Sequence, residues 1–263
     1  MAMTDIDDIR ATAHLLADAA RAETLRLFRD PALRPDNKAG QGYDPVTQAD
    51  RASEKAMRAI LAARRPGDSI LGEEYGFQRG DSGLTWILDP IDGTRAFIAG
   101  APTWGVLIGV ADESGPIYGI IDQPYTEERF EGGFGLATLT SRRGVAPLAV
   151  RRDVELGQAL LMSTYPEVGS ATDQAGFARV ASRVKLTRYG IDCYAYALLA
   201  AGHVDLVIEA GLQSYDIAAP IAVIRAAGGI VSDWEGGPAH EGGRVIAAAS
   251  PELHAAALEL LAG

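Results

Sequence analysis

Two carboxylates three positions apart end an apolar run at residues 86–92, and a glycine and a hydroxyl residue follow them. The carboxylates are Asp89 and Asp92, and the next residues are Gly93 and Thr94. Because Mg²⁺ prefers oxygen ligands such as carboxylates, the pair indicates a cation site. Gly93 lets a ligand approach the backbone closely, and a helix beginning at Thr94 would direct free N–H groups at an anion. This stretch therefore offers ligands for a metal and donors for a phosphate group.

An Asp-x-x-Asp pair beside a proline is, by itself, typical of an ordinary turn. Three further acids favour the metal interpretation, because each lies beside an expected turn or helix start: Asp50, Glu73 and Asp216. Carboxylates that converge repel one another, and divalent cations relieve that repulsion. Two magnesium ions about 3.5–4 Å apart are a common arrangement in phosphoryl chemistry. We therefore expect a site that binds two or three Mg²⁺ ions.

The composition narrows the classes of partner. The chain has 263 residues, 48% of them hydrophobic, and a formal net charge of −11. Nucleic-acid binding usually depends on a surplus of Lys and Arg, so we expect no nucleic-acid partner. An acidic protein that acts on a phosphorylated small molecule needs positive charge from another source, which again favours divalent cations.

Cysteine content and hydropathy predict where the protein works. Cys193 is the single cysteine, so the chain forms no intrachain disulfide, and a reducing cytoplasm is expected. No stretch reaches the roughly 20 apolar residues that a membrane helix needs. The first ten residues contain no apolar run of the signal-peptide kind. We therefore expect a cytoplasmic protein with no membrane partner.

Periodicity and turn residues predict the elements that must position the acids. Apolar spacing predicts a helix at about 4–30 and a second at 47–65, which Thr47 would cap with Asp50 in its first turn. An apolar strand is expected at 84–88, and the turn at 112–115 joins two further strands into a hairpin. Beyond residue 158 strand and helix patterns alternate, with helices expected at about 170–184, 194–201, 215–227 and after residue 250.

The change of pattern near residue 150 predicts two lobes. Residues 1–145 would form an N-terminal α+β lobe that carries the metal and phosphate motif. Residues 146–263 would form a C-terminal α/β lobe that completes the site. Clefts between lobes commonly bind small ligands, so we expect the site there.

Three motifs, in order along nearly the whole chain, resemble the signatures of the inositol monophosphatase family. They are Gly72-Glu73-Glu74, the run at residues 86–94, and the stretch at 215–219 that is followed by 226–229. The resemblance implies a layered α-β-α-β-α sandwich, usually assembled as a homodimer. It also implies a magnesium-dependent, lithium-sensitive phosphomonoesterase that acts on a small phosphorylated substrate.

The resemblance implies a ligand set for the cations. Glu73, Asp89 and the carbonyl oxygen of Ile91 would hold one cation. Asp89, Asp92 and Asp216 would hold a second.

The resemblance also implies catalytic and phosphate-binding roles. Residues 44–50 are similar to the family's N-terminal motif, whose last acid, here Asp50, positions the attacking water together with Thr94. Glu73 joins these two residues as a catalytic group. Gly93 and Thr94 would bind the phosphoryl oxygens through their N–H groups. Lys38 lies one residue away from the position of the family's loop lysine.

Within the family, the second half of the chain looks more like the histidinol-phosphate phosphatase branch, on residues 188–196 and 202–209. Histidinol phosphate carries an ammonium group and an imidazole, so its pocket should offer acids away from the metals. Asp192 and Glu209 are the candidates, and Arg188 is a further expected substrate-binding residue. The alternatives are a helix-capping role for Asp192 and an ordinary edge position for Glu209.

One residue departs from the pattern of that branch. The branch usually has two glycines before the aspartate, whereas Ile191 occupies the second position here. A β-branched residue adopts positive φ with difficulty and adds bulk, so we expect a different fit to the substrate.

The leading hypothesis is therefore hydrolysis of L-histidinol phosphate to L-histidinol and phosphate, a step of histidine biosynthesis. An inositol phosphate, another sugar phosphate or a nucleotide bisphosphate is the alternative substrate. A reading of another class is an inactive regulator that binds metal or phosphate. The sequence disfavours a regulator, because it retains Asp50 and Thr94.

Overall fold

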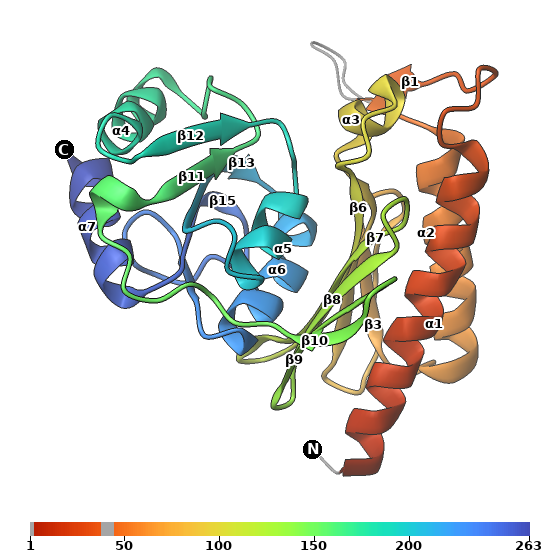
Figure 1. Cartoon of the computed structure of the whole chain (residues 1–263). Helices are drawn as coiled ribbons and strands as arrows, with labels where there is room; N and C mark the ends of the chain where they lie inside the picture. The colour runs from red at the N-terminus through yellow and green to blue at the C-terminus, as the bar shows by residue number, and fades with distance from the viewer. Residues whose placement is uncertain (1–2, 38–44) are drawn as a thin grey trace.

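A computed structural model describes residues 3–37 and 45–263, so Lys38 and Asp44 lie outside the described residues (Figure 1). The described chain forms seven α-helices, a short 3-10 helix and two large mixed sheets. The helices are α1 (Met3–Leu27), α2 (Gln48–Arg64), α3 (Thr94–Ala99), α4 (Ala171–Ala181), α5 (Tyr194–Ala200), α6 (Ser214–Ala226) and α7 (Pro251–Ala262), with η1 at Leu156–Gln158.

The first sheet has eight strands in the order β10-β9-β8-β7-β6-β5-β3-β4. Neighbouring strands are antiparallel except β3 and β5, which are parallel. The strands are β3 (Ser69–Gly72), β4 (Gly76–Gln78), β5 (Thr85–Asp92), β6 (Gly105–Asp112), β7 (Gly115–Gln123), β8 (Glu128–Gly133), β9 (Leu136–Ser141) and β10 (Gly144–Pro147). A separate antiparallel pair joins β1 (Asp36–Asn37) to β2 (Pro45–Val46).

The second sheet has five strands in the order β12-β11-β13-β15-β14. Strand β11 runs parallel to β12 and β13, whereas β15 is antiparallel to β13 and β14. The strands are β11 (Leu160–Ser163), β12 (Leu186–Tyr189), β13 (Leu206–Leu212), β14 (Ile230–Ser232) and β15 (Gly243–Ala248).

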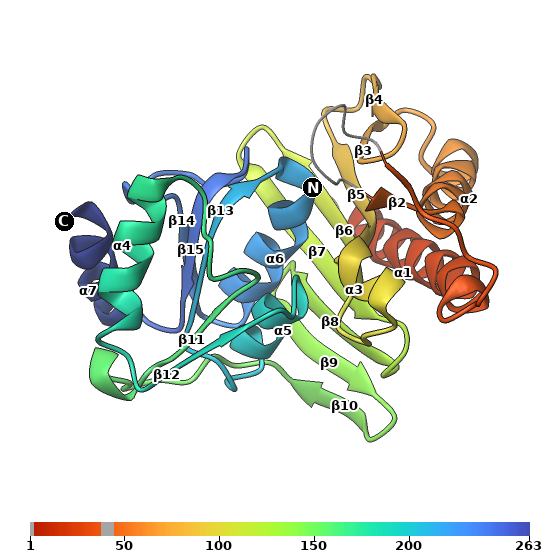
Figure 2. The ribbon, with the colours of Figure 1, turned by 90° about the horizontal axis from the view of Figure 1, so that it is seen from above.

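Helices and sheets alternate in five layers (Figures 1 and 2). Helices α1 and α2 lie side by side on the outer face of the first sheet, and α4 and α7 cover the outer face of the second. Helices α5 and α6 lie between the two sheets. Three buried hydrophobic clusters fill the interfaces between these layers. The architecture confirms the expected layered α-β-α-β-α fold.

A row of glycines sets α6 against the first sheet. Gly109, Gly119 and Gly132 are direct cross-strand neighbours on β6, β7 and β8. A Cβ atom on Gly119 would lie 2.5 Å from the carbonyl oxygen of Ala219, and one on Gly132 would lie 2.5 Å from the Cα of Val223. Helix α6 therefore approaches the sheet more closely than side chains at these positions would allow.

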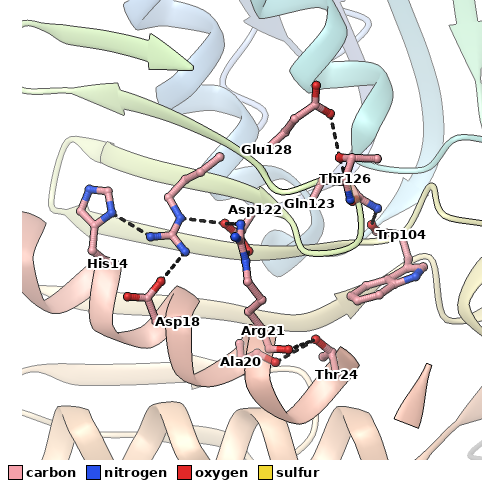
Figure 3. A network of polar contacts seen from close by, with 11 residues as sticks. His14, Asp18, Ala20, Arg21, Thr24, Trp104, Asp122, Gln123, Thr126 and Glu128 are labelled. Atoms are coloured by element: carbon pink, nitrogen blue, oxygen red, sulfur yellow. Dashed lines mark hydrogen bonds and ion pairs between the residues drawn. The ribbon is translucent and has the colours of Figure 1, made fainter. Parts of the chain in front are cut away.

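Ion pairs attach α1 to the same sheet. Figure 3 shows Arg21 of α1 beside Asp122, whose side chain is fully buried; the shortest contact joins the guanidinium Nη2 to Oδ1 at 2.7 Å. Arg129 of β8 donates to the same Oδ1 at 2.7 Å and also to Asp18 of α1 at 2.7 Å. Two guanidinium groups thus compensate one buried carboxylate, which makes the burial of Asp122 tolerable.

The sequence predicted the long elements but missed several short ones. The helices expected at both ends of the chain and the hairpin of β6 and β7 are confirmed. The polar connection expected after Glu74 contains strand β4, and residues 36–37 and 45–46 form the β1–β2 pair. Within the described residues, no helix is both long and apolar enough to cross a bilayer. The lobe boundary at residue 145 remains a proposal.

Candidate active site

Strand β5 delivers the first two acids of the site. It lies inside the first sheet between β3 and β6, so its residues are almost completely buried. An irregularity in the pairing with β6 falls between Asp89 and Asp92. There the Asp89 carboxylate accepts a hydrogen bond from the N–H of Ile91 at 3.0 Å. The strand end thus turns both carboxylates toward one region.

Asp216 joins this pair from another layer. Oxygen atoms of Asp89, Asp92 and Asp216 all lie within 4.8 Å of one another. Asp216 belongs to the first turn of α6, where the N–H of Gln213 donates to it at 2.6 Å. Because the glycine row holds α6 close to the first sheet, the start of this helix reaches the end of β5.

Glu73 is the fourth acid at this place. It follows β3 directly, and its N–H donates to the carbonyl oxygen of Leu88 on β5 at 3.2 Å. Glu73 lines the same cavity as Asp92 and Asp216, and its charge raises the pKa of Asp89.

The convergence of these acids changes their pKa values. Burial and the charges of Glu73, Asp92 and Asp216 raise the pKa of Asp89 well above its usual range. Burial and the charges of Asp192 and Asp216 do the same for Asp92, opposed by the N–H of Cys193, which donates to it at 2.5 Å. Burial raises the pKa of Asp216 to about 6.

These acids fit a hard divalent cation. All the converging donor atoms are carboxylate oxygens. The charges of the neighbouring acids add to the effect of burial in raising the pKa of Asp89. Magnesium prefers oxygen ligands, and its charge would remove the repulsion. The structure thus brings together Glu73, Asp89, Asp92 and Asp216, four of the five residues expected to bind metal through their side chains or backbone; the fifth, Ile91, lies between two of them.

Asp50 and Thr94 meet beside this cluster. Thr47 caps α2, and its N–H and hydroxyl donate to Asp50 Oδ2 at 2.9 and 2.6 Å. The Thr94 hydroxyl lies 3.2 Å from Asp50 Oδ1 and 3.1 Å from the carbonyl oxygen of Ile91. A buried acid and a hydroxyl group are therefore held together next to the end of β5.

A cavity of about 400 Å³ opens onto the cluster. Its lining combines the acids from the first sheet and α6 with residues of the second sheet and of the loop before α5. Among the lining residues are Glu73, Asp92, Thr94, Asp192, Glu209 and Asp216. The cavity is large enough for a small phosphorylated metabolite.

Glu209 lines the cavity from the second sheet. Strand β13 lies between β11 and β15, so Glu209 is not an edge residue. The N–H and hydroxyl of Thr164 donate to Glu209 Oε1 at 2.7 and 2.9 Å. Burial raises the pKa of Glu209 to about 7, although the Thr164 hydrogen bonds lower it.

Asp192 faces the cavity at the start of α5. The N-cap residue of α5 is Cys193, whose N–H donates to Asp92, so the capping alternative for Asp192 is not observed. Burial raises the pKa of Asp192 to about 6, and the positive charge of Arg95 acts in the opposite direction. The left-handed φ values in this loop belong to Gly190 (91°) and Asp192 (43°). Ile191 is therefore free of the strain that the sequence suggested, and it packs against the central core.

Arg188 is placed elsewhere. It lies exposed on β12, an edge strand, and it is not among the described residues that line the cavity. Arg188 does not reach the cavity because β12 ends at Tyr189, before the chain reaches the cavity at Asp192.

Arg95 and Tyr165 line the cavity, and the sequence did not single them out. Arg95 of α3 donates to the Tyr165 hydroxyl at 2.6 Å, and its guanidinium carbon lies 5.3 Å from the centre of that ring. This contact bridges the two sheets across the cavity. The position of Arg95 directly after Thr94 was the available signal, but no local pattern pairs it with a tyrosine 70 residues away.

The sequence matches a known family of proteins. The model of the inositol monophosphatase family matches residues 5–262. The chain belongs to the inositol monophosphatase family. Members of this family are metal-dependent phosphatases, and the described residues contain an acidic cluster of Asp89, Asp92 and Asp216.

Relatives within the family carry different names. The bifunctional phosphatase IMPL2 of Arabidopsis thaliana, a chloroplast protein, is 38% identical over 98% of this chain and 76% of its own length. A histidinol-phosphatase of Streptomyces coelicolor is 35% identical over 95% of this chain and 94% of its own. The solved structure of an inositol monophosphatase from Zymomonas mobilis is 39% identical, covers 100% of both chains and superposes with a TM-score of 0.87. The chain is thus similar to phosphatases with more than one named substrate.

Proposed function

We propose that this phosphatase hydrolyses L-histidinol phosphate in a magnesium-dependent reaction. The observation that carries the proposal is the position of Asp192 and Glu209, which line the same cavity as the acid cluster but lie on the second sheet's side of it. A phosphate bound near the cluster would leave the amino alcohol part of the substrate facing these two acids.

The proposed metal site uses the residues that resemble the family motif. Glu73, Asp89 and the Ile91 carbonyl would hold one Mg²⁺, and Asp89, Asp92 and Asp216 would hold a second. Bound magnesium would neutralise phosphate charge and lower the pKa of a water molecule.

Side-chain and backbone groups of the chain can position the attacking water and the phosphate ester. The Thr94 hydroxyl and Asp50 Oδ1 lie 3.2 Å apart, so one water molecule beside them can contact both oxygens. Asp50 Oδ1 can accept a proton from that water as the water oxygen bonds to phosphorus and the phosphorus–oxygen bond to the alcohol breaks. The leaving alkoxide takes up a proton from solvent and departs as the alcohol. The N–H groups of Gly93 and Thr94 can donate to phosphoryl oxygens and keep the ester in line for attack.

The acids of the second sheet suit a cationic substrate. Burial raises the pKa of Asp192 to about 6 and that of Glu209 to about 7. An ammonium or imidazolium group beside them would favour their charged forms and would be held by charge-assisted hydrogen bonds. The positive charge of the bound substrate would attract Asp192 and Glu209 and offset the repulsion between these acids and the metal-binding acids.

Inositol monophosphate is the second candidate. The hydroxyl groups of Thr164 and Tyr165 belong to residues that line the cavity, and hydroxyls can bind the neutral hydroxyl groups of a sugar alcohol. This candidate makes less use of Asp192 and Glu209, which have no cation to bind in that substrate.

A phosphate-release assay with Mg²⁺ tests the proposal. The panel contains histidinol phosphate, inositol phosphate, fructose bisphosphate and adenosine bisphosphate. We expect histidinol phosphate to have the highest kcat/KM, and a higher value for another ester would refute the substrate assignment. No release from any ester, despite folded protein and saturating Mg²⁺, would favour a regulator instead.

The remaining features of the proposal are a homodimer, inhibition by Li⁺ and a cytoplasmic role in histidine biosynthesis. Light scattering of the purified chain tests the dimer. Titration of Li⁺ into the phosphate-release assay tests the inhibition.

A further inference from the structure

We propose that Glu54 is a positioning residue that holds Glu73 in the orientation needed to bind Mg²⁺, an inference that rests on the function proposed above. Glu54 lies on α2, one helical turn after Asp50, and its side chain is completely buried, with 0% exposed. A buried carboxylate is costly unless hydrogen bonds and an opposite charge compensate it. Here the compensation comes from the turn that carries Glu73.

The Glu54 carboxylate binds the backbone directly after Glu73. Its Oε2 accepts a hydrogen bond from the N–H of Glu74 at 2.7 Å, and Oε1 accepts one from the N–H of Tyr75 at 3.2 Å. The N–H of Glu74 lies in the same peptide plane as the Cα of Glu73. The contact therefore fixes the plane on which the Glu73 side chain is mounted.

Arg58, one turn further along α2, extends this contact. Its Nε donates to Glu54 Oε1 at 2.7 Å, and its Nη2 donates to the carbonyl oxygen of Gly76 at 2.5 Å. Its guanidinium carbon also lies 5.9 Å from the centre of the Tyr75 ring. The Glu54–Arg58 pair thus binds the turn between β3 and β4 at three successive residues.

Gly72 shows how closely the turn packs on Glu54. A Cβ atom on Gly72 would lie 2.0 Å from Glu54 Oε1, so a side chain here would displace the carboxylate. The glycine that precedes Glu73 in the motif is therefore required by the contact with α2.

Helix α2 consequently controls two separate parts of the site. Asp50 in its first turn contacts Thr94, and Glu54 one turn later fixes the backbone next to Glu73. Residues four positions apart lie on one helix face, so both acids point toward the first sheet. Glu54 is not among the described residues that line the cavity, and it acts through Glu73.

The Glu54→Gln variant tests this role with little change in volume. Glutamine accepts hydrogen bonds at one oxygen only, so its NH₂ group would face at least one of the three donors that Glu54 now binds. We expect the metal-free variant, titrated with Mg²⁺ in a calorimeter, to bind about 10–100-fold more weakly, as is usual when an outer partner of a metal ligand is lost. At saturating Mg²⁺, kcat should fall much less than the affinity.

A second readout needs no metal. Hydrogen exchange of the metal-free chain should become faster at the Glu74 and Tyr75 amides in the Glu54→Gln variant. Arg58→Lys keeps the positive charge but loses the contact with Gly76, so it should change both readouts in the same direction. If Glu54→Gln does not fold, Arg58→Lys decides the question.

Asp205→Asn is the matched control. Asp205 is also completely buried, accepts a hydrogen bond from Arg151 Nε at 2.9 Å and accepts one from the N–H of Leu160 at 2.7 Å. It lies in the second sheet's region, away from the cluster, so its loss should lower stability without changing the Mg²⁺ affinity. An Asp205→Asn variant that lost Mg²⁺ affinity to the same extent would overturn the specific role of Glu54.

The outcomes separate this inference from the proposed function. If the unmodified chain bound no Mg²⁺, the proposed function would fail. If the unmodified chain bound Mg²⁺ and Glu54→Gln bound it equally well, with unchanged amide exchange, only the positioning role would be overturned.

Discussion

The carboxyl group of Asp192 lies directly against Gly93. A Cβ atom on Gly93 would come within 2.8 Å of both Cγ and Oδ2 of Asp192. Gly93 follows the two acids at the end of β5, and Asp192 lies in the loop directly before α5. The two halves of the candidate site therefore meet at a position where only a glycine fits, and its φ of 87° is itself one that glycine favours.

Gly93→Ala should greatly reduce activity. The new methyl group would displace Asp192, and a positive φ costs alanine about 1–2 kcal/mol. We expect a loss of about 100-fold in kcat, the scale of a 1 Å misplacement, measured by phosphate release. Gly144→Ala is the control, because Gly144 has a φ of 99° but nothing within 4 Å of an added Cβ. Equal activity losses in the two variants would contradict the argument.

Asp89→Asn should nearly abolish turnover while leaving the fold intact. Asp89 is 2% exposed and carries the carboxylate that both proposed cations share. The loss should exceed the roughly 10–100-fold typical of an outer partner of a metal ligand. In the metal-free state, at a pH above the raised pKa of Asp89, the variant should melt at a higher temperature, since one repelling charge is gone. Unchanged turnover would rule out the metal assignment.

The stability of the metal-free protein should fall as the pH rises from 5 to 7.5. Burial raises the pKa values of Asp192 and Asp216 to about 6 and that of Glu209 to about 7, so the folded state holds protons that the unfolded state has already released. Stability therefore decreases with pH across this window, by a few kcal/mol in total at about 1.4 kcal/mol for each pKa unit.

Denaturant titrations at several pH values measure this effect. Glu131 does not interfere, because its hydrogen bonds to His14, Arg10 and Tyr118 lower its pKa to about 2, and its contribution is lost only in more acidic solution. Saturating Mg²⁺ should flatten the dependence. A metal-free protein that became more stable toward pH 7.5 would contradict the prediction.

Gly119→Ala should displace α6 and weaken metal binding. The added Cβ would meet the backbone of Ala219, which cannot rotate away. We expect destabilisation at the upper end of the about 1–3 kcal/mol typical of overpacking, together with lower Mg²⁺ affinity because Asp216 moves with the helix. Gly157→Ala is the control, because its nearest neighbour would be 4.0 Å away. Thermal unfolding measures the loss of stability, and calorimetry measures the Mg²⁺ affinity. Full Mg²⁺ affinity in Gly119→Ala would refute the role of the glycine row.

Asp192→Asn should mainly raise KM for histidinol phosphate. A hydrogen bond to a charged group contributes about 1.5–3 kcal/mol, so kcat/KM should fall by about 10–100-fold. An inositol phosphate, which carries no ammonium group, should be affected much less. A loss confined to kcat, or an equal loss for both esters, would show that Asp192 does not bind the amine.

The sequence by itself determined the local features of this protein. Short stretches of residues determine the spacing of Asp89 and Asp92 before Gly93. They also determine the Thr47 cap with Asp50 in the first helical turn, and the long helices. Such features depend on backbone preferences and hydrogen bonds within a few positions, so periodicity and turn chemistry were enough to predict them. The order of the motifs further supported the layered fold.

Only the tertiary structure decided which distant residues meet. Gly119 looked like any strand glycine until its neighbours on β6 and β8 and the backbone of α6 were in place. Arg188 begins the stretch of sequence that leads to Asp192 but lies exposed on β12, whereas Arg95 reaches Tyr165 across the cavity. These contacts depend on how two sheets and the helices between them pack together, and packing distances of that kind are not encoded in any local pattern.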